Sequence, residues 1–372
     1  MAAPLGVAIF GCGGVSGGHF SAYATNPKAR LVAAVDVRPD LAEAAARRWQ
    51  IPRWYSSVEE ALADPAVQIA DLCLPHDLHA PVALAAAAAG KHVFVEKPIA
   101  NTLDEADAMI AACHQHGVTL MVDQTKRYQN RHREIKRLLD AGYIGAPVLV
   151  KGAYLQDITY AWQHMDPKRL ATYWKHDGVI SGIGIHALDL LRWLIGEASE
   201  VQAIATTSDL IAPTRQTEDS AIILLRFANG CIGEVTVSYV LKDPRLGASW
   251  DVMPLQIYGR EGSLQLDWNN SITLVSDRLP NDGGPGILHL PAKPPVGAPP
   301  PPLEGMAGAI DHLLDCLLNG EQPLTHGEDA RKSLELVAAA YRSLHERQAI
   351  ALPLQPTARA RVAAMSQVGG GA

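Results

Sequence analysis

The chain has 372 residues, of which 48% are hydrophobic and 19% are charged, and its formal net charge is −7. A chain of this length predicts two domains, and the acidic balance argues against nucleic acid or a membrane surface as a partner. The five cysteines include no C-x-x-C pair, which suits a reducing cytoplasm and argues against disulfide bonds or a metal site. No stretch is apolar for long enough to span a bilayer, and a strand predicted from residue 5 leaves no room for a signal peptide.

The first predicted element is a strand over Leu5 to Phe10, followed by a glycine-rich turn and a helix. The turn reads Gly11-Cys12-Gly13-Gly14-Val15-Ser16, a G-x-G-x-x-S pattern. Gly11 permits the tight turn, Gly13 lets the backbone approach a pyrophosphate, and Ser16 is small enough to replace a third glycine. The helix N-terminus that follows offers free N–H groups to the anion. The motif therefore predicts dinucleotide binding.

An acidic residue closes the next predicted strand, which runs from Leu31 to Val35. Asp36 lies near the position where a carboxylate accepts from both ribose hydroxyls of NAD, and it would repel a 2′-phosphate. These features favour NAD as the cofactor. Arg38 follows two residues later and keeps NADP as an alternative.

Helices and strands then alternate up to about residue 124. This alternation predicts a parallel sheet wound on both faces, a Rossmann domain over residues 1–124. The predicted elements are a helix over 40–50, a strand over 68–74, a helix over 79–89, a strand over 93–95, a helix over 103–117 opened by a capping box at Thr102 and Glu105, and a strand over 118–122.

Strand-like runs dominate the second half of the chain. They predict a C-terminal α+β domain over residues 125–355, with a large, mostly antiparallel open sheet and helices on one face. Residues 280–302 contain nine of the 25 prolines, which predicts a loop or surface arm instead of a strand, and 356–372 read as a flexible tail. A sheet face left uncovered by helices predicts a homo-oligomer.

Glu96-Lys97-Pro98 follows a predicted parallel strand, at the edge where doubly wound sheets bind ligands. A lysine there can reach a substrate oxygen beside the nicotinamide, and its cation favours an alkoxide over the alcohol. Pro98 fixes the turn and is a candidate for a cis peptide bond. A surface lysine after a strand is the alternative reading of the tripeptide alone.

A second candidate group surrounds His186, at the start of a predicted helix over 183–195. The positive end of the helix dipole disfavours imidazolium, which would help the histidine act as a base near neutral pH. Asp189 lies three residues later on the same helix face, close enough to orient the ring. A helix-start histidine with a polar partner is the structural alternative.

Together these motifs resemble the Gfo/Idh/MocA (glucose–fructose oxidoreductase, inositol dehydrogenase, MocA) family over roughly residues 5–355. The resemblance rests on the glycine turn, on Pro75 to His79, on Gly90 to Pro98 with its Glu-Lys-Pro end, on Arg127-Tyr128 and on Gly184 to Asp189. It implies a nicotinamide cofactor, an N-terminal Rossmann domain, a C-terminal open-sheet domain and frequent assembly into homodimers or homotetramers. The family's motif lysine and histidine correspond to Lys97 and His186. The family commonly has an aspartate four residues before the histidine, and here that residue is Gly182.

The remaining candidates follow strand ends, where polar and aromatic groups suit a cofactor or a sugar ring. For the histidines in the set, supporting a neighbouring ligand residue or capping a helix is an equal alternative, and for the tyrosines a place in the core or an interface is. Further cofactor candidates are Leu74, Pro75, His76, His79, Glu96, Lys97, Gln124, Trp174 and Lys175. Substrate candidates are Lys97, Gln124, Arg127, Tyr128, Tyr154, His186 and Asp189, with Tyr160 and Trp162 nearby.

The sequence therefore predicts a cytoplasmic NAD(P)-dependent oxidoreductase that acts on a hydroxyl-bearing carbon of a sugar, polyol or glycoside. His186 would take the hydroxyl proton, and Lys97 would orient the oxygen. Redox-assisted glycoside cleavage or epimerisation with recycled NAD is an alternative on the same fold. A non-catalytic dinucleotide sensor is the alternative from another class.

Overall fold

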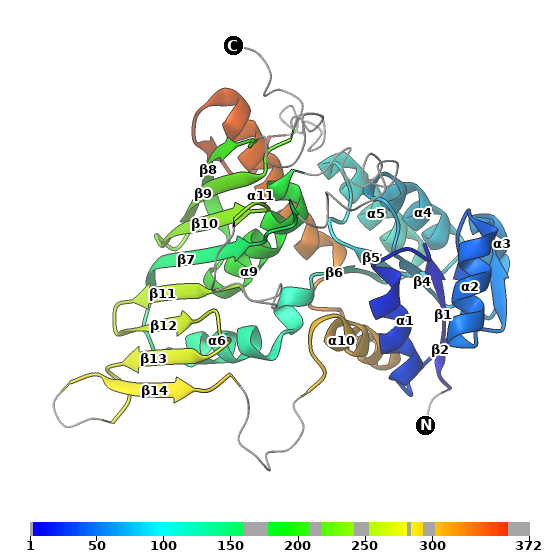
Figure 1. Ribbon diagram of the computed structural model, residues 1–372, viewed down its shortest axis with the longest axis horizontal. Helices are drawn as coiled ribbons and strands as arrows, with labels where there is room; N and C mark the ends of the chain where they lie inside the picture. Colours follow the sequence, from blue (N-terminus) through cyan, green and yellow to red (C-terminus); the bar gives the residue numbers. More distant parts are fainter. Residues whose placement is uncertain are drawn as a thin grey trace. The chain divides into compact units, whose positions relative to one another are not determined.

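The computed structural model describes residues 3–159, 178–208, 217–241, 253–280, 284–292 and 302–355. Trp174, Lys175, Tyr160, Trp162 and the predicted tail lie outside these residues. The chain forms two compact units (Figure 1): Met1–Gln129 with Pro302–Leu334, and Asn130–Pro301 with Glu335–Ala372. Within the described ranges, no helix is both long enough and apolar enough to cross a membrane.

The first unit contains a six-stranded parallel sheet in the order β3-β2-β1-β4-β5-β6, which confirms the predicted Rossmann fold. Its strands are β1 (Leu5–Phe10), β2 (Ala29–Val35), β3 (Arg53–Tyr55), β4 (Ile69–Leu72), β5 (His92–Glu96) and β6 (Leu120–Asp123). Its helices are α1 (Ser16–Thr25), α2 (Pro39–Trp49), α3 (Val58–Ala63), α4 (His76–Ala88), α5 (Leu103–His116), the short 3₁₀ turn η1 (Thr125–Tyr128) and α10 (Gly305–Asn319).

The capping box predicted for α5 is present. The Thr102 hydroxyl accepts from the Glu105 N–H at 3.0 Å, and the Glu105 carboxylate accepts from the Thr102 N–H at 3.0 Å. Two of the free N–H groups at this end of the segment are thereby satisfied. Gly117, with a φ of +64°, ends the helix in the left-handed conformation that glycine adopts without strain.

Residues 302–334 belong to the first unit, whereas the sequence placed them in the second domain. The reason is the apolar face of α10, on which Ile310 and Leu313 are completely buried. Both join the hydrophobic core that contains Ile9 on β1 and Phe20 on α1. Burying this apolar face against the Rossmann core is favourable, and this explains why α10 packs in the first unit although it follows the strands of the second unit in the chain.

The second unit contains a nine-stranded sheet in the order β14-β13-β12-β11-β7-β10-β9-β8-β15. Only the β7–β10 pairing is parallel, so the predicted, mostly antiparallel sheet is confirmed. Its strands are β7 (Pro147–Leu155), β8 (Ala198–Thr206), β9 (Ser220–Phe227), β10 (Ile232–Ser238), β11 (Leu255–Gly259), β12 (Gly262–Leu266), β13 (Ile272–Ser276), β14 (Gly286–Leu290) and β15 (Ile350–Ala351).

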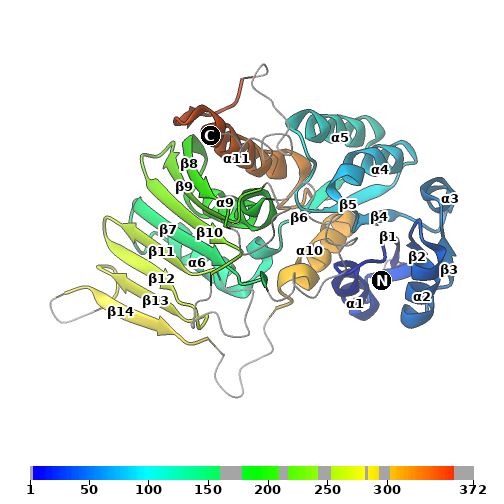
Figure 2. The same cartoon turned by 45° about the horizontal axis from the view of Figure 1, so that its top comes forward.

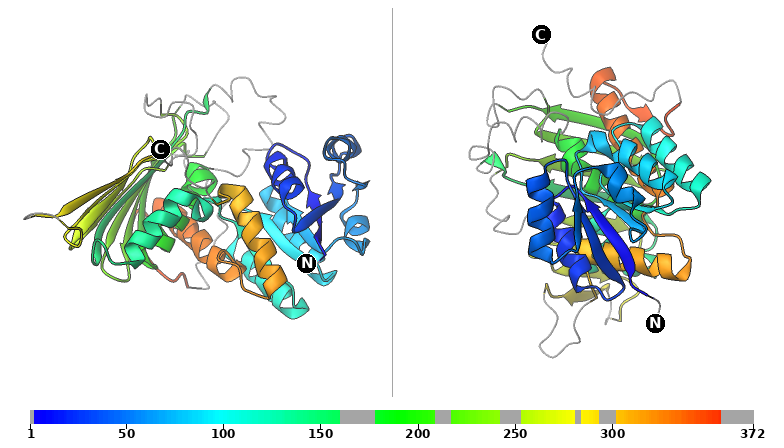
Figure 3. Two further views of the ribbon diagram at one scale, coloured as in Figure 1. Left: turned by 90° about the horizontal axis from the view of Figure 1, so that it is seen from below. Right: turned by 90° about the vertical axis from the view of Figure 1, so that its right-hand side faces the viewer.

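Helices α6 (Asn130–Asp140) and α9 (Ile185–Ile195) lie against one face of this sheet (Figure 2). A π-helical turn, η2 (Ile180–Gly184), leads directly into α9, and α11 (Gly327–Glu346) follows α10 in the chain. Along β9 the odd-numbered residues are buried and the intervening ones exposed, as expected for a sheet covered on one side. Figure 3 (left) shows that the drawn helices leave the opposite face open.

The prediction that residues 280–302 contain no strand is wrong. Gly286–Leu290 forms β14, an edge strand that pairs with β13. The prolines at 285 and 291 flank the strand and leave every N–H within it available for pairing. Counting prolines over a long window concealed a five-residue segment without one.

Candidate functional site

The glycine turn after β1 has the geometry that the sequence motif predicts. Gly11 has a φ of +93°, and a Cβ atom there would lie 2.3 Å from the Cys73 carbonyl oxygen, so only glycine fits. A Cβ on Gly13 would meet no atom within 4 Å, and the Ser16 hydroxyl donates to the Gly13 carbonyl at 2.8 Å. The protein backbone therefore packs closely against Gly11 and leaves free space beside Gly13. Gly14 and Val15 lead into α1.

Asp36 is oriented by two backbone donors. Its carboxylate accepts from the Cys12 N–H at 2.8 Å and from the Arg38 N–H at 2.9 Å. The Arg38 guanidinium points elsewhere and pairs with Asp40 at 2.7 Å. Burial and the neighbouring Asp36 raise the pKa of the Cys12 thiol to about 12, so the thiol is neutral at physiological pH.

These residues fit a dinucleotide. The open space at Gly13 gives a pyrophosphate room beside the N-terminus of α1, and Asp36 presents a carboxylate fixed at the end of β2. At the end of β6, both amide atoms of Gln124 are buried without a hydrogen-bond partner. A buried amide in this condition suits a polar group such as a carboxamide.

The turn after β4 is braced by His79. Its Nε2 lies 3.0 Å from the Leu74 carbonyl oxygen and its Nδ1 lies 2.8 Å from the Pro98 carbonyl oxygen. Burial, together with His76, lowers the pKa of His79 to about 4, so the ring is neutral and its single N–H donates to one of these two carbonyl oxygens. This geometry favours the bracing role over direct cofactor contact. The His76 ring lies 5.5 Å from the His79 ring, and Pro75 precedes α4.

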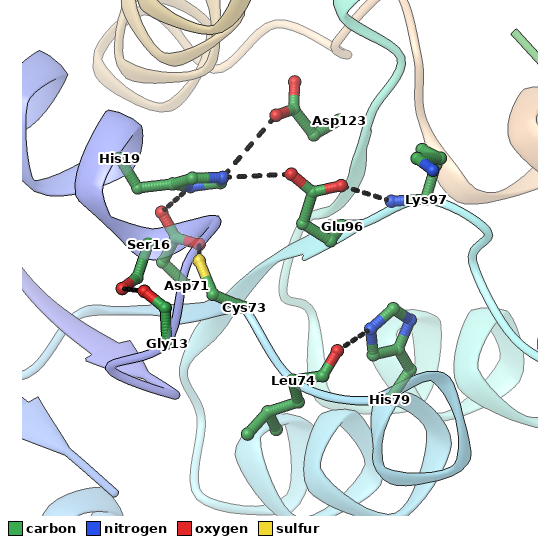
Figure 4. A network of polar contacts seen from close by, with 10 residues as sticks. All are labelled: Gly13, Ser16, His19, Asp71, Cys73, Leu74, His79, Glu96, Lys97 and Asp123. Atoms are coloured by element: carbon green, nitrogen blue, oxygen red, sulfur yellow. Dashed lines mark hydrogen bonds and ion pairs between the residues drawn. The ribbon is translucent and has the colours of Figure 1, made fainter. Parts of the chain in front are cut away.

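A buried cluster of ionisable side chains holds the strand end that carries Lys97 (Figure 4). His19 of α1 contacts Asp71 through Nδ1 at 2.9 Å and Glu96 through Nε2 at 3.2 Å. The second Glu96 oxygen accepts from the Lys97 N–H at 3.1 Å. The Lys97–Pro98 peptide is cis. The backbone of Lys97 is thereby tied through Glu96 to the imidazole of His19.

The charges in the cluster are balanced by protons. Burial lowers the pKa of His19, but the charge and hydrogen bond of Asp71 together with Cys73 raise it, so the net pKa lies well above its usual value. Asp123, at 3.7 Å from His19, has a pKa raised well above its usual value by burial and by the charge of Glu96. Burial opposes ionisation of Glu96, but the hydrogen bond and charge of His19 lower its pKa overall.

The ligand atoms of His19, Glu96 and Asp123 lie within 4.8 Å of one another, a spacing that a metal ion could also use. The pKa shifts of His19 and Asp123 are both upward, so both groups favour a bound proton that offsets the buried carboxylate charge, and we interpret the cluster as a proton-mediated network.

Two of the substrate candidates after β6 are used by the core. Tyr128 is completely buried, and its hydroxyl lies 3.1 Å from the Thr325 hydroxyl. Arg127 is 1% exposed and pairs with Asp329 of α11 at 2.8 Å. Both fix the chain after β6 against residues 302–334, and this explains their burial without a substrate.

The second unit carries His186, which lies on α9 and is 9% exposed. The Tyr154 ring, on β7, lies 6.0 Å from the His186 ring, and Asp189 is completely buried, 3.9 Å from the Arg192 guanidinium. The helical backbone begins at η2, so His186 is more than a turn from the N-terminus, and the dipole effect predicted for the histidine is weaker at that distance. The buried Glu218 carboxylate accepts from the Ile180 N–H at 3.1 Å and faces that N-terminus instead.

Sequence reasoning missed His19, Asp71, Asp123, Glu218 and Tyr239. A signal existed for the two aspartates, because an acid within or at the end of a buried apolar strand requires a partner. His19 occupies the buried face of α1, three residues after Ser16, where an apolar residue is the usual choice. For Glu218 and Tyr239 the sequence carries no comparable signal.

The fold and the glycine turn define the class, an oxidoreductase with an NAD-binding Rossmann domain. Residues 5–124 match the oxidoreductase family with an NAD-binding Rossmann fold, and residues 132–265 match the GFO/IDH/MocA C-terminal domain. The chain belongs to the Gfo/Idh/MocA family and is an NAD(P)-dependent dehydrogenase or reductase.

Named relatives are similar over most of their length. D-apiose dehydrogenase of Paraburkholderia graminis is 28% identical over 93% of this chain and 89% of the relative. Levoglucosan dehydrogenase of Pseudarthrobacter phenanthrenivorans is 29% identical over 78% of this chain and 81% of the relative. A structure of levoglucosan dehydrogenase with NADH and levoglucosan superposes with a TM-score of 0.80 at 25% identity, over 94% of this chain and all of that one.

Proposed function

We propose that this protein is an NAD-dependent dehydrogenase that oxidises a hydroxyl-bearing carbon of a sugar, polyol or glycoside. The observation that carries the proposal is Lys97, which follows β5 at the ligand-binding edge of the parallel sheet and whose backbone is fixed by Glu96. The names of the similar dehydrogenases, which refer to D-apiose, levoglucosan and inositol, support the substrate class.

The chain's own residues have four tasks in this proposal. Asp36 accepts from the adenosine ribose, and the Gln124 amide orients the carboxamide end of the cofactor. His186 takes the proton of the reacting hydroxyl, and the Lys97 ammonium polarises the same oxygen. NAD, when bound, supplies the hydride acceptor. The Lys97 cation lowers the energy of the developing alkoxide, because opposite charges attract strongly in a site from which water is excluded.

The test is a spectrophotometric panel of free sugars, inositols, anhydrosugars and glycosides with NAD and with NADP. We expect NADH to appear in step with an oxidised product for at least one neutral polyhydroxy compound. Product formation from a glycoside without accumulation of NADH would instead indicate cleavage or epimerisation with recycled cofactor. Cofactor binding without turnover of any member, in either direction, would contradict a dehydrogenase of this substrate class.

A further inference from the structure

The space beside Gly182 is filled by the side chain of Tyr239. A Cβ atom on Gly182 would lie 2.0 Å from the Tyr239 hydroxyl oxygen and 3.2 Å from its Cζ. A contact of 2.0 Å is far inside van der Waals distance, so glycine at 182 is required for the ring to lie where it does. The Tyr239 hydroxyl therefore lies in the direction that any side chain at 182 would take.

His186 lies on the same face of its helical segment as Gly182. Residues four apart on a helix lie on the same face, and Gly182 precedes His186 by four. The two residues belong to one continuous helical segment, η2 followed by α9. Single π-helical turns such as η2 occur frequently at functional sites.

Tyr239 is held in place by its backbone on both sides. Its N–H donates to the Asp219 carbonyl at 2.8 Å, and its carbonyl accepts from the Ile158 N–H at 3.0 Å. The side chain is 4% exposed, so the ring has little freedom to move away from Gly182. A substitution at 182 therefore has to displace a fixed group.

A second phenol lies beside His186. Tyr154 of β7 is opposite Val237 of β10, and Tyr239 is the residue that directly follows β10. The Tyr154 ring is 6.0 Å from the His186 ring. Because β7 and β10 are parallel neighbours, their C-terminal ends are adjacent, and the two tyrosines lie near that common end.

A phenol differs chemically from a carboxylate in this position. A tyrosine hydroxyl is neutral at pH 7 and both donates and accepts a hydrogen bond, whereas a carboxylate is charged and only accepts. A donor can bind an oxygen that carries no hydrogen, such as a ring or ether oxygen, as well as a hydroxyl. The residue at this place therefore influences which oxygens the site accepts beside the reacting carbon.

We propose that Tyr239 is a specificity-determining residue, whose hydroxyl binds an oxygen of the sugar or polyol next to the hydroxyl that His186 deprotonates. This assignment rests on the proposed function. It takes the role that a polar side chain at position 182 would otherwise have, and Gly182 provides the room for it.

The first experiment tests the geometry without any substrate. Thermal unfolding is measured for wild type, Gly182→Ala, Tyr239→Phe and the double variant. We expect Gly182→Ala to lower Tm by roughly 2–8 °C in the wild-type background, because it overpacks a buried contact. The loss should be much smaller in the Tyr239→Phe background, because the nearest remaining ring atom is 3.2 Å away. Equal effects in both backgrounds would overturn the placement of Tyr239.

The second experiment tests the role. The fastest substrate of the panel is compared with analogues that each lack one oxygen: the monodeoxy compounds, each without one hydroxyl, and the analogues in which a ring or bridging oxygen is replaced by CH₂. Tyr239→Phe should lower kcat/KM for the parent substrate by roughly 2- to 10-fold, the usual worth of one neutral hydrogen bond. One analogue, which lacks the contacted oxygen, should be insensitive to the substitution. Tyr258→Phe, on the exposed face of the sheet, is the matched control and should change neither value.

A uniform loss with the parent and every analogue, or no loss at all, would show that Tyr239 only packs and would overturn the assignment. If the wild type turns over no member of the panel, the proposed function fails and the role of Tyr239 fails with it. The unfolding cycle still decides the geometry in that case, so the two failures remain distinguishable.

Discussion

Asp36 and Arg38 are two residues apart, but their side chains make opposite contributions to cofactor choice. Asp36 is fixed by the N–H groups of Cys12 and Arg38, so its free lone pairs are oriented at the end of β2. Arg38, which could hold a 2′-phosphate, pairs with Asp40 on an exposed surface. Exposed pairs of this kind contribute little, so Asp40 restrains Arg38 only weakly.

We expect Asp36→Ala to narrow the preference for NAD over NADP, because it removes both the acceptor for the ribose hydroxyls and the repulsion of a 2′-phosphate. Adding Asp40→Ala should move the preference further toward NADP by releasing Arg38. The measurement is Kd for NADH and NADPH by fluorescence titration. Asp40→Ala alone is the control and should leave NADH affinity unchanged. A wild type that binds NADPH about tenfold more tightly, a difference of roughly 1.4 kcal/mol, would contradict the role of Asp36.

His186 and Lys97 belong to different compact units, and kinetics can test whether they act on the same oxygen. His186→Ala should lower kcat by roughly 10²- to 10⁴-fold, the usual contribution of a positioned acid or base. Its NADH affinity should stay near that of wild type, because the candidates for the adenosine and pyrophosphate contacts lie in the first unit. Lys97→Ala should also lower kcat, and the double variant should be little worse than the poorer single variant. The proposal fails if His186→Ala keeps more than about a tenth of wild-type kcat.

The sequence predicted the residues whose role is set by local chemistry and missed those set by long-range contacts. The geometry of Gly11, the carboxylate of Asp36 and the strand-end position of Lys97 follow from a motif within a few residues of each. The partners His19 and Glu96 are 77 residues apart in the chain, so no local pattern links them. Gly182 appeared only as the absence of an expected aspartate, because Tyr239, which fills the space, is 57 residues away in the chain, directly after β10.

At the scale of elements, the buried cluster joins α1 to three neighbouring strands, β4, β5 and β6. Two of its members, His19 and Asp123, make the stability of the fold depend on pH. The raised pKa of His19 stabilises the fold below about pH 6.5 and loses this contribution as the pH rises through the folded value. The raised pKa of Asp123 means that the folded state holds a proton that the unfolded chain releases above about pH 4. Both groups therefore lower the stability as the pH rises, whereas Glu96, with a lowered pKa, acts in the acid range.

The predicted loss of stability with rising pH can be tested with Asp123→Asn, which keeps the shape of the side chain and removes the ionisable proton. At the acid end of the range wild-type Asp123 keeps most of its proton, so the difference in Tm between the two proteins should be smallest there. At higher pH the variant should become progressively more stable than wild type, by up to about 1.4 kcal/mol per pH unit, because wild type must bear a buried carboxylate or hold a proton against the solution. Thermal unfolding from pH 5 to 9 measures the difference. Asp77→Asn, an exposed acid on α4, is the control and should show a pH-independent offset. A constant difference for Asp123→Asn would mean that Asp123 is already ionised in the fold.

At the scale of the whole molecule, the open sheet of the second unit exposes neighbouring aliphatic side chains, and nothing in the described part of the chain covers them. Cross-strand neighbours Ile204 and Ile222, on β8 and β9, are 72% and 48% exposed. Leu224, two residues further on β9, is 47% exposed on the same face. Adjacent aliphatic side chains on paired strands form a contiguous apolar patch, and such patches on soluble proteins mark surfaces for association.

We therefore expect the protein to be a homo-oligomer that buries this patch. The solution mass from light scattering at micromolar concentration should be a multiple of the 39.8 kDa chain mass. The double variant Ile204→Glu, Ile222→Glu should shift the mass toward the monomer, because like charges directly opposite on paired strands repel and resist burial. Its circular dichroism should stay unchanged, because both side chains lie on the exposed face, away from the core residue Ile223. Gln265→Glu, an exposed residue on β12, adds a charge away from the patch and should leave the mass unchanged. A wild-type protein that runs as a clean monomer would contradict the prediction. In that case the aliphatic patch on β8 and β9 would remain exposed to water in the native protein.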